Sequence, residues 1–217
     1  MMLFLPQLLE GAVVTIEVTA CASVLAIIMG FAAGLARLSR WWIVRAVTVV
    51  YVEVFRGSSA LVQLFWLFFV LPFFGINLTA FEAAVLALGL NVGAYGSEVV
   101  RGAILAVPKG QYEAARSLNF SHSRMMRRII IPQAVVAMLP PWGNLLIELL
   151  KNTALVSLIT LSDLAFKAYQ LNQATFRSTE IFSMVLVIYF IIALGMTGII
   201  RLLERWFGRG ILYRGAA

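Results

Sequence analysis

The sequence predicts an all-α membrane protein that crosses the bilayer with five helices. Three observations support this fold class: 62% of the 217 residues are hydrophobic, only 12% are charged, and the apolar residues form long runs. A soluble domain of this length cannot bury so much apolar surface. A helix needs about 20 mainly apolar residues to cross a hydrocarbon core about 30 Å thick. Five runs are long enough, at residues 11–36, 46–71, 81–105, 129–150 and 181–200.

The first three runs carry few charges. The first contains one acid, Glu17, and the second is apolar after Arg56. The third contains Glu98 and Arg101. Small residues recur in GFAAGLA within the first run and in GLNVGAYGSEVVRG within the third. Helices in lipid approach closely through small residues, so we expect tight packing between these two spans.

Prolines break the fourth run, and the fifth has no charge at all. Pro132, Pro140 and Pro141 interrupt the fourth run. Neighbouring helices in a bundle can satisfy the carbonyl groups that a proline frees, so this run still counts as a span. We find no linker and no second soluble domain, and residues 1–217 are expected to form a single membrane domain.

The basic residues predict the orientation of the chain. Most of the 17 Lys and Arg residues lie in three segments that fall on one side of the membrane if there are five spans. Because basic loops stay in the cytoplasm, we expect the N-terminus outside and the C-terminus in the cytoplasm. Topology therefore accounts for the net charge of +7, and we expect no nucleic-acid partner. The three segments hold Arg37, Arg40 and Arg45; Arg101, Lys109, Arg116, Arg124, Arg127 and Arg128; and Arg201, Arg205, Arg209 and Arg214.

The sequence lacks the residue patterns of the common catalytic sites. A phosphate-binding loop requires a Gly-Lys pair, and the chain has none. One histidine, His122, and one cysteine, Cys21, cannot form a metal-ligand motif. No serine has the surroundings of a nucleophile elbow. We expect no catalytic residue, no metal site and no bound cofactor, and hence no enzyme activity in this chain alone.

Segment 106–128 is the most basic part of the chain and is predicted to lie flat at the cytoplasmic face. PKGQYEAARSLNF reads as a short helix that starts near Pro108 and brings Tyr112, Ala115 and Leu118 to one side. NFSHS breaks this helix, and Ser121 or Ser123 can cap a second one. A plain polybasic helix that binds anionic lipid would have a similar composition.

The order of residues in this segment resembles the EAA loop of the permease subunits of bacterial ABC importers. Glu113-Ala114-Ala115, then Asn119, then Ile129 to Pro132 follow the spacing of that loop without a gap. Two positions depart from it: Asn119 replaces the usual glycine, and Ile131 replaces the usual leucine. Asparagine is the next-best residue for a left-handed turn, so the first change is mild.

Most of the remaining chain resembles the polar-amino-acid uptake branch of the same family. The resemblance runs through QLLEGAVVTIEVT, YVEVFRGSSALVQLF, LNVGAYGSEVVRGAILAVPKGQYEAARSL and PQAVVAMLPPWGNLLIELLKNTALVSLI. GSSALVQ and LLKNTALVS stand where that branch commonly has GTPLLVQ and LLKDTSLVS. The missing acid at Asn152 argues against a cationic cargo. Within the branch, the chain is most similar to subunits that import ectoine and hydroxyectoine, which are zwitterionic compatible solutes.

The resemblance implies a permease subunit of the bacterial cytoplasmic (inner) membrane that moves a polar amino acid or an amino-acid-like solute. Its expected partners are an ABC ATPase that binds ATP and Mg²⁺, an extracytoplasmic solute-binding protein, a second permease that is identical or related, and membrane lipid. The implied ATPase-docking residues are Glu113, Ala114, Ala115, Leu118 and Asn119. The implied residues of the substrate path are Gln63, Asn91, Tyr95, Glu98, Lys151, Asn152 and Thr153.

Structural explanations compete with several of these roles. Hydrogen bonds between packed spans explain each substrate-path residue equally well. Opposite charges three residues apart predict ion pairs, namely Glu53 with Arg56, Glu98 with Arg101 and Glu148 with Lys151. For the whole chain, the alternatives are an ATP-independent secondary transporter or channel and a membrane anchor that transports nothing.

Overall fold

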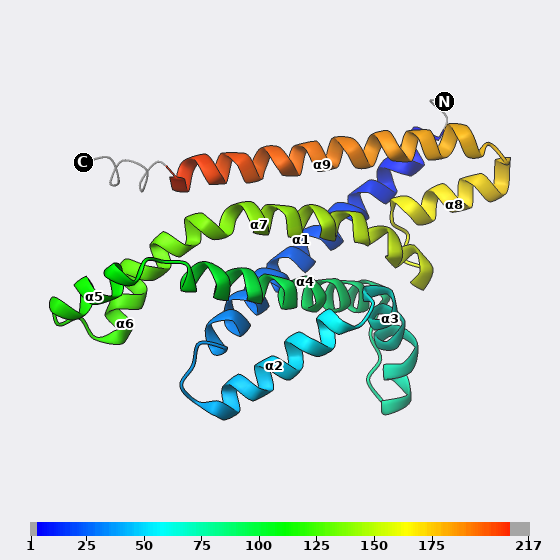
Figure 1. Ribbon diagram of the computed structural model, residues 1–217. Helices are drawn as coiled ribbons and strands as arrows, with labels where there is room; N and C mark the ends of the chain where they lie inside the picture. Colours follow the sequence, from blue (N-terminus) through cyan, green and yellow to red (C-terminus); the bar gives the residue numbers. More distant parts are fainter. Residues whose placement is uncertain (1–3, 209–217) are drawn as a thin grey trace.

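The computed structural model describes residues 4–208, and the regular secondary structure of this part is all helical, which confirms the predicted all-α class (Figure 1). Arg209 and Arg214 lie outside the described residues. The α-helices are α1 (Leu5–Ala36), α2 (Trp42–Gly57), α3 (Ala60–Phe65), α4 (Ala80–Leu105), α5 (Lys109–Ser117), α6 (His122–Met125), α7 (Ile131–Asn152), α8 (Leu164–Thr175) and α9 (Ser178–Gly208). Short π- and 3₁₀-helical segments extend them at Trp66–Val70, Leu71–Phe74, Met126–Ile130 and Thr153–Ile159.

Four helical stretches within the described residues are long and apolar enough to cross a membrane. They are Leu5–Ala36, Ala80–Leu105, His122–Ile159 and Ser178–Trp206. A fifth span exists only if α2 and the following stretch Ala60–Phe74 are counted together, and these two are bent by 105°.

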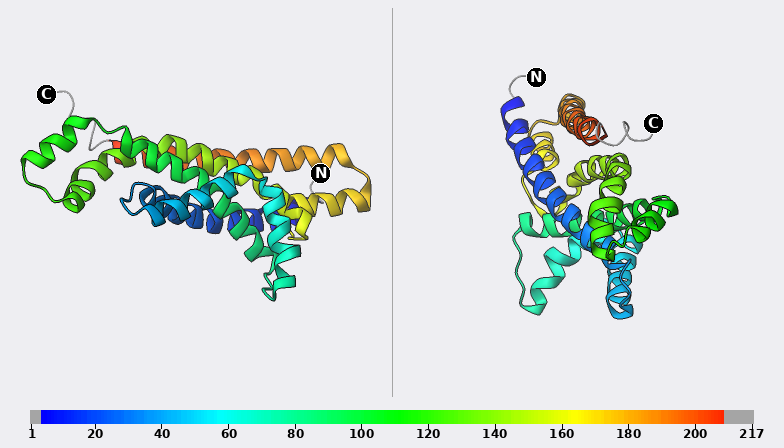
Figure 2. Two further views of the ribbon diagram at one scale, coloured as in Figure 1. Left: turned by 60° about the horizontal axis from the view of Figure 1, so that its bottom comes forward. Right: turned by 90° about the vertical axis from the view of Figure 1, so that its left-hand side faces the viewer.

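The second span predicted at 46–71 is therefore not one continuous helix but a pair of helices joined at a sharp bend. Ser58 and Ser59 both have extended backbone conformations, so the helix ends at Gly57 and a new one starts at Ala60. Gly57 and the two serines are poor helix formers, which explains why the chain breaks here within an apolar run. Viewed end-on, α2 and the stretch Ala60–Phe74 diverge below the bundle (Figure 2).

The core forms around α4, which packs along α1 and against α7. Its inward face consists largely of small residues, including Ala83, Ala84, Ala87, Gly89, Gly93 and Gly96. The Trp142 ring of α7 enters the space that two glycines leave: a Cβ at Gly96 would lie 2.3 Å from this ring, and a Cβ at Gly30 would lie 2.6 Å from it. Phe31 stacks on Trp142 with ring centroids 6.2 Å apart. These contacts confirm the close packing expected for the first and third spans.

A second, smaller core joins the start of α1 to α8 and α9. It contains Phe4, Leu8, Ala12, Leu164, Ala168, Ile181 and Val185. This core lies near one end of the bundle, whereas α5 and α6 lie at the opposite end (Figure 1). Segment 106–128, which the sequence places at the cytoplasmic face, therefore lies at the end of the molecule opposite to α8.

Asp163 caps α8 within this second core. Its Oδ1 accepts a hydrogen bond from the backbone N–H of Phe166 at 2.9 Å, while the residue as a whole is buried. Burial raises the pKa of Asp163 to about 6, because the charged form loses its hydration. The folded chain therefore holds the Asp163 proton more tightly than the unfolded chain does.

This raised pKa makes a testable difference to stability. As pH rises from about 4 to above 6, ionisation of Asp163 should cost the folded state about 2–3 kcal/mol. Asp163→Asn keeps a capping side chain but cannot ionise, so its stability should not fall over this window. Thermal unfolding of wild type and variant in detergent at pH 4.5 and pH 7.5 measures the difference. Equal pH dependence in both proteins would show that Asp163 is not the group responsible.

Candidate functional site

Polar side chains of α4 surround the bend between α2 and α3. Because α2 ends at Gly57, its last carbonyl groups have no partner within the helix. The Asn91 side-chain amide donates a hydrogen bond to the Phe55 carbonyl at 2.8 Å, and the Tyr95 hydroxyl donates to the Arg56 carbonyl at 3.3 Å. Two predicted residues of the substrate path therefore stabilise the broken helix.

Gln63 closes the same bend from α3. Its side-chain nitrogen donates to the Phe55 carbonyl at 2.8 Å and to the Ser58 hydroxyl at 2.8 Å. Its side-chain oxygen accepts a hydrogen bond from Asn91 at 3.1 Å. The structure thus brings Gln63, Asn91 and Tyr95 together around one bend, and all three make hydrogen bonds to the chain itself.

Glu98, also on α4, binds arginines from three helices. Arg101 lies one turn away with its Nε 3.0 Å from the carboxylate, which confirms the predicted Glu98–Arg101 pair. Arg56 at the end of α2 approaches to 3.3 Å, and Arg37 at the end of α1 also donates to this carboxylate. The guanidinium of Arg56 lies over the Tyr95 ring, 5.3 Å from its centroid. One carboxylate therefore joins α1, α2 and α4.

Two of the three predicted ion pairs are wrong for the described residues. Arg56 binds Glu98 rather than Glu53, because the end of α2 packs beside α4. Glu148 and Lys151 form no ion pair, although they lie on the same helix face.

The remaining predicted path residues lie where α7 ends and the segment Thr153–Ile159 begins, and this segment contacts α3 and α4. Thr153 is buried, and its hydroxyl donates to the Leu150 carbonyl at 2.7 Å. Asn152 is half-buried and Lys151 is exposed. Of these three residues, only Lys151 is exposed on the surface of the chain.

The exposed face of α7 carries no large hydrophobic side chain and becomes polar in its second half, which distinguishes α7 from the other long helices. Its exposed residues include Ala137, Pro141, Asn144, Glu148 and Lys151, spaced by three and four residues. No large hydrophobic side chain of α7 is exposed among the described residues, whereas α9 exposes Phe182, Leu186, Val187, Phe190, Ile191 and Leu194. This polar face was not predicted, although the spacing of Asn144, Glu148 and Lys151 is readable in the sequence.

The predicted helix, turn and helix of segment 106–128 is present as α5 and α6. Asn119 between them has a positive φ of 56°, the left-handed conformation expected at this position. Pro108 directly precedes α5. Ser121 is the N-cap residue of α6, as predicted, but its side chain makes no capping hydrogen bond. Beyond Ser121, Met125 and Ile130 are buried while Arg124, Arg127 and Arg128 stay exposed.

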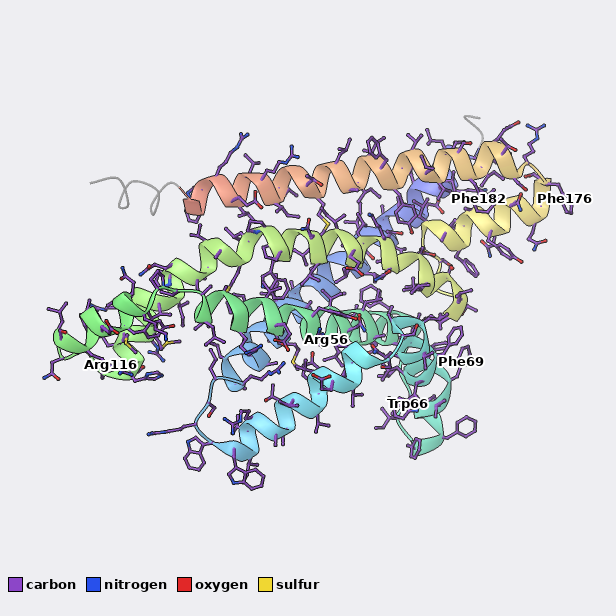
Figure 3. The ribbon with its side chains drawn as sticks, viewed as in Figure 1. Arg56, Trp66, Phe69, Arg116, Phe176 and Phe182 are labelled. Atoms are coloured by element: carbon purple, nitrogen blue, oxygen red, sulfur yellow. The ribbon has the colours of Figure 1, made fainter. Side chains whose placement is uncertain are left out.

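The surface of α5 differs in part from the predicted docking surface. Glu113, Ala114, Leu118 and Asn119 are exposed, and Arg116 projects near the outer tip (Figure 3). Leu118 was expected on the same side of the helix as Tyr112 and Ala115, but it is 71% exposed whereas Ala115 is buried. Ala115 is fully buried against its own chain, so its small side chain serves the packing of α5.

Tyr112 fixes how α5 lies on the bundle. Its hydroxyl donates to the Ile104 carbonyl at the end of α4 at 2.9 Å. This bond anchors the inner side of α5 and leaves Glu113 and Ala114 facing outward.

Comparison with known sequences gives consistent matches over most of the chain. The family model described as binding-protein-dependent transport system inner membrane component matches residues 22–209. The probable amino-acid ABC transporter permease protein y4tF of Sinorhizobium fredii is 48% identical, covering 94% of this chain and 90% of its own length. The glutamine transport system permease protein GlnP of Escherichia coli is 37% identical, with 93% of each chain covered. The L-cystine permease protein TcyB of Bacillus subtilis is 41% identical over 78% of this chain and 72% of its own.

Solved structures match the fold as well. The crystal structure of an amino acid ABC transporter with histidines superposes with a TM-score of 0.88 at 38% identity, covering 94% of this chain and 96% of that one. The MetNI methionine ABC transporter in an inward-facing conformation gives a TM-score of 0.79 at 20% identity, covering 93% and 96% of the two chains. The second match is a likeness of fold alone.

Proposed function

The chain belongs to the family of binding-protein-dependent transport system inner membrane components, and from this premise we propose that it moves an amino acid as the permease subunit of an ABC importer. The relatives named above are permease proteins for glutamine, for L-cystine and for an unspecified amino acid. Ectoine, the solute predicted from resemblance, is a zwitterion like these amino acids and is the second candidate.

The exposed helix α5, joined to α6 through Asn119, is the observation that carries the proposal. It projects from one end of the bundle and exposes Glu113 and Ala114 (Figure 1). Ala114 lets another protein approach closely, and Glu113 offers a carboxylate for a polar contact. We place the ATPase on this exposed surface, which consists of Glu113, Ala114, Leu118 and Asn119. Ala115 is buried beneath it and packs α5 against the rest of the chain.

The ATPase supplies what this chain lacks. ATP and Mg²⁺ bind to the ATPase subunit, since the sequence has no phosphate-binding loop. The permease therefore transports without being an enzyme itself. In this arrangement α5 and α6 lie in the cytoplasm, and α8 lies on the outer side, where an extracytoplasmic binding protein delivers the solute.

The polar side chains on the exposed face of α7 indicate that a second permease lies across the substrate path. This second permease is another copy of the chain or a related protein. A helix face with Asn144, Glu148 and Lys151 is unfavourable in lipid, so in the assembly it borders water or another chain. The apolar faces of α1 and α9 suit lipid instead. Exposed aromatic side chains at the far end of α9 and on the stretch Ala60–Phe74, including Phe176, Phe182, Trp66 and Phe69, suit the membrane interface (Figure 3).

Transport then follows as a shift between two conformations of the bundle. Closure of the ATPases on ATP draws the α5 helices together and favours an outward-facing state, and hydrolysis returns the bundle to the inward-facing state. The bend at Ser58–Ser59, stabilised by Gln63, Asn91 and Tyr95, borders this path. The ion pairs of Glu98 hold α1, α2 and α4 together beside this bend.

Reconstitution tests the proposal. The permease is co-expressed with its neighbouring ATPase, placed in liposomes, and supplied with binding protein and radiolabelled L-glutamine, other common L-amino acids or ectoine. We expect uptake that needs ATP, and we expect the ATPase to be captured with wild type but not with Glu113→Lys. Uptake that persists with a catalytically dead ATPase would favour an ATP-independent transporter or channel. An assembled complex that moves no solute would favour the membrane anchor.

A further inference from the structure

A buried polar cluster near the end of the bundle remote from α5 contains an acid that the proposed transport cycle does not use. Its four members come from four elements: Thr15 from α1, Thr153 from the segment Thr153–Ile159, Asp163 at the N-cap of α8 and Tyr189 from α9. The Tyr189 hydroxyl lies beside the other three side chains. The cluster therefore joins a predicted residue of the solute path to three helices.

The start of α8 packs closely on the backbone of α1. A Cβ at Gly11 would lie 2.7 Å from the Asp163 carbonyl oxygen. The Leu164 N–H donates a hydrogen bond to the Thr15 hydroxyl at 3.1 Å. Because of this close approach, solvent does not reach Asp163, whose exposed fraction is 0%.

Two buried atoms of the cluster, Asp163 Oδ2 and the Tyr189 hydroxyl, make no hydrogen bond within the described residues. The hydroxyl groups of Thr15 and Thr153 cannot donate to them, because each already donates to a backbone carbonyl, at 3.1 Å and 2.7 Å. Within the cluster, Tyr189 is thus the only side-chain donor available to an ionised Asp163. A neutral carboxyl brings one more proton, so that Asp163 can donate to Tyr189 and Tyr189 to Thr153.

No basic side chain of the described chain balances a charge on Asp163. Lys167, one turn further along α8, binds Glu10 of α1 at 3.3 Å instead. Burial without a counter-ion raises the pKa of Asp163 to about 6. The other titratable groups on the surrounding helices form no ion pair or hydrogen bond with Asp163: they are Glu17 and Cys21 on α1, Glu148 and Lys151 on α7, Tyr169 on α8, and Arg177, Glu180, Arg201, Glu204 and Arg205 on or just before α9.

We propose that the cluster is a proton-binding site in the outer half of the bundle: neutral Asp163 holds the segment Thr153–Ile159 against α1, α8 and α9, and ionisation of Asp163 releases this segment. The inference rests on the proposed function, which places α8 on the side from which the solute enters. Asp163 and Tyr189 act as positioning residues and do not touch the solute. Since the segment also contacts α3 and α4, its release changes the solute path beside the bend.

The direction of the pH effect follows from the two states of Asp163. In the buried state its pKa is about 6, whereas in a state open to water the pKa returns to its ordinary value of about 4. Proton binding therefore favours the buried state, and this preference is complete below pH 4 and lost as pH rises through 6. Between pH 5.0 and pH 7.5, the equilibrium shifts about tenfold towards the open state.

Uptake at controlled external pH tests the site. Liposomes that carry the permease and ATPase hold ATP at constant internal pH, and binding protein is added outside with radiolabelled L-glutamine, or with the amino acid that wild type takes up. Wild type should transport about tenfold faster at external pH 7.5 than at pH 5.0. Asp163→Asn keeps a capping side chain that cannot ionise, so its uptake at pH 7.5 should fall about tenfold and lose this pH dependence. Because the binding protein is the same throughout, its own pH dependence affects both proteins equally.

Two further variants separate a proton site from a role in packing. Tyr189→Phe removes the donor to the ionised carboxylate, so the midpoint of the uptake profile should move to higher pH. A loss of packing alone would lower the rate at every pH by the same factor. Glu82→Gln is the matched control, because Glu82 is also an acid in a helix N-terminal cap but is exposed, and it should retain the wild-type profile.

Infrared spectra of the permease and ATPase complex give a readout that does not require transport. At pH 5.5, wild type should show the C=O stretch of a protonated carboxylic acid that Asp163→Asn lacks. This band should disappear when ATP and a hydrolysis-deficient ATPase hold the complex in the outward-facing state, because Asp163 then becomes hydrated and ionises.

Parallel uptake profiles in wild type and Asp163→Asn would overturn the inference, and so would identical carboxylic acid bands in the two proteins. If wild-type uptake depends on ATP, either result removes the proton site and leaves the proposed function standing. If wild type shows no ATP-dependent uptake at any pH, the proposed function fails, and the infrared band alone then decides whether Asp163 holds a proton that the outward-facing state releases.

Discussion

Ala114→Asp is expected to reduce ATP-dependent uptake at least 100-fold while the permease still inserts and folds. Ala114 is exposed on α5, so the new carboxylate does not disturb the packing of this chain. When the ATPase covers α5, the charge is buried without a partner. Such burial costs about 3 kcal/mol or more, and 1.4 kcal/mol corresponds to a factor of ten in binding. Uptake into liposomes and ATPase activity measured on the same samples give the two readouts.

The neighbouring alanine supplies the control for this experiment. Ala115 differs from Ala114 by one position but is fully buried in its own chain. Ala115→Asp should therefore lower the yield and thermal stability of the permease alone, before any ATPase is added. If Ala114→Asp transports normally, α5 is not the docking helix. If the two variants behave alike in the isolated permease, the orientation of α5 described here is incorrect.

Glu98→Gln should destabilise the permease more than any other neutral substitution of an acid in the chain. The change keeps the size of the side chain but leaves Arg37, Arg56 and Arg101 without their common anion. Removal of one partner from a largely buried ion pair typically costs about 3–5 kcal/mol, and Glu98 is a quarter exposed, so we expect about 3 kcal/mol. For a chain of this length, that corresponds to a fall of about 6–12 °C in Tm.

Thermal unfolding in detergent measures this effect, with Glu53→Gln as the control. Glu53 was predicted to bind Arg56, but Arg56 binds Glu98, so loss of the Glu53 charge should change Tm by less than about 2 °C. If Tm falls further in Glu53→Gln than in Glu98→Gln, Arg56 pairs with Glu53, as the sequence predicted, rather than with Glu98. High salt should reduce the difference in Tm between wild type and Glu98→Gln only slightly, since three quarters of the Glu98 side chain is shielded from solvent.

The features that depend on local composition could be predicted from the sequence. The lengths of the apolar runs predicted the long helices. The pattern of PKGQYEAARSLNF and the break at NFSHS predicted the short helix, the turn and the second helix. The left-handed turn at Asn119 followed from the conformational freedom of asparagine, and the structure confirms it. Each of these features depends on residues within about 20 positions of one another.

The features that depend on contacts between distant residues could not be predicted. The apolar run from 46 to 71 does not reveal the direction of the chain, so the 105° bend at Ser58–Ser59 was missed. Arg56 binds Glu98, 42 residues away, because α2 packs beside α4. The side of α5 that faces outward was only partly predicted, because a nine-residue helix is oriented by an anchor such as Tyr112 rather than by its own periodicity.

The glycines around Trp142 also restrict how this sequence can vary over evolutionary time. A single methyl group at Gly96 of α4 would overlap the indole, and one at Gly30 of α1 would overlap the same edge of the ring. A substitution at any one of these three positions is therefore tolerated only with a compensating change at another. A related permease with a larger residue at either glycine position must carry a smaller one in place of the tryptophan, so the three positions should diverge together.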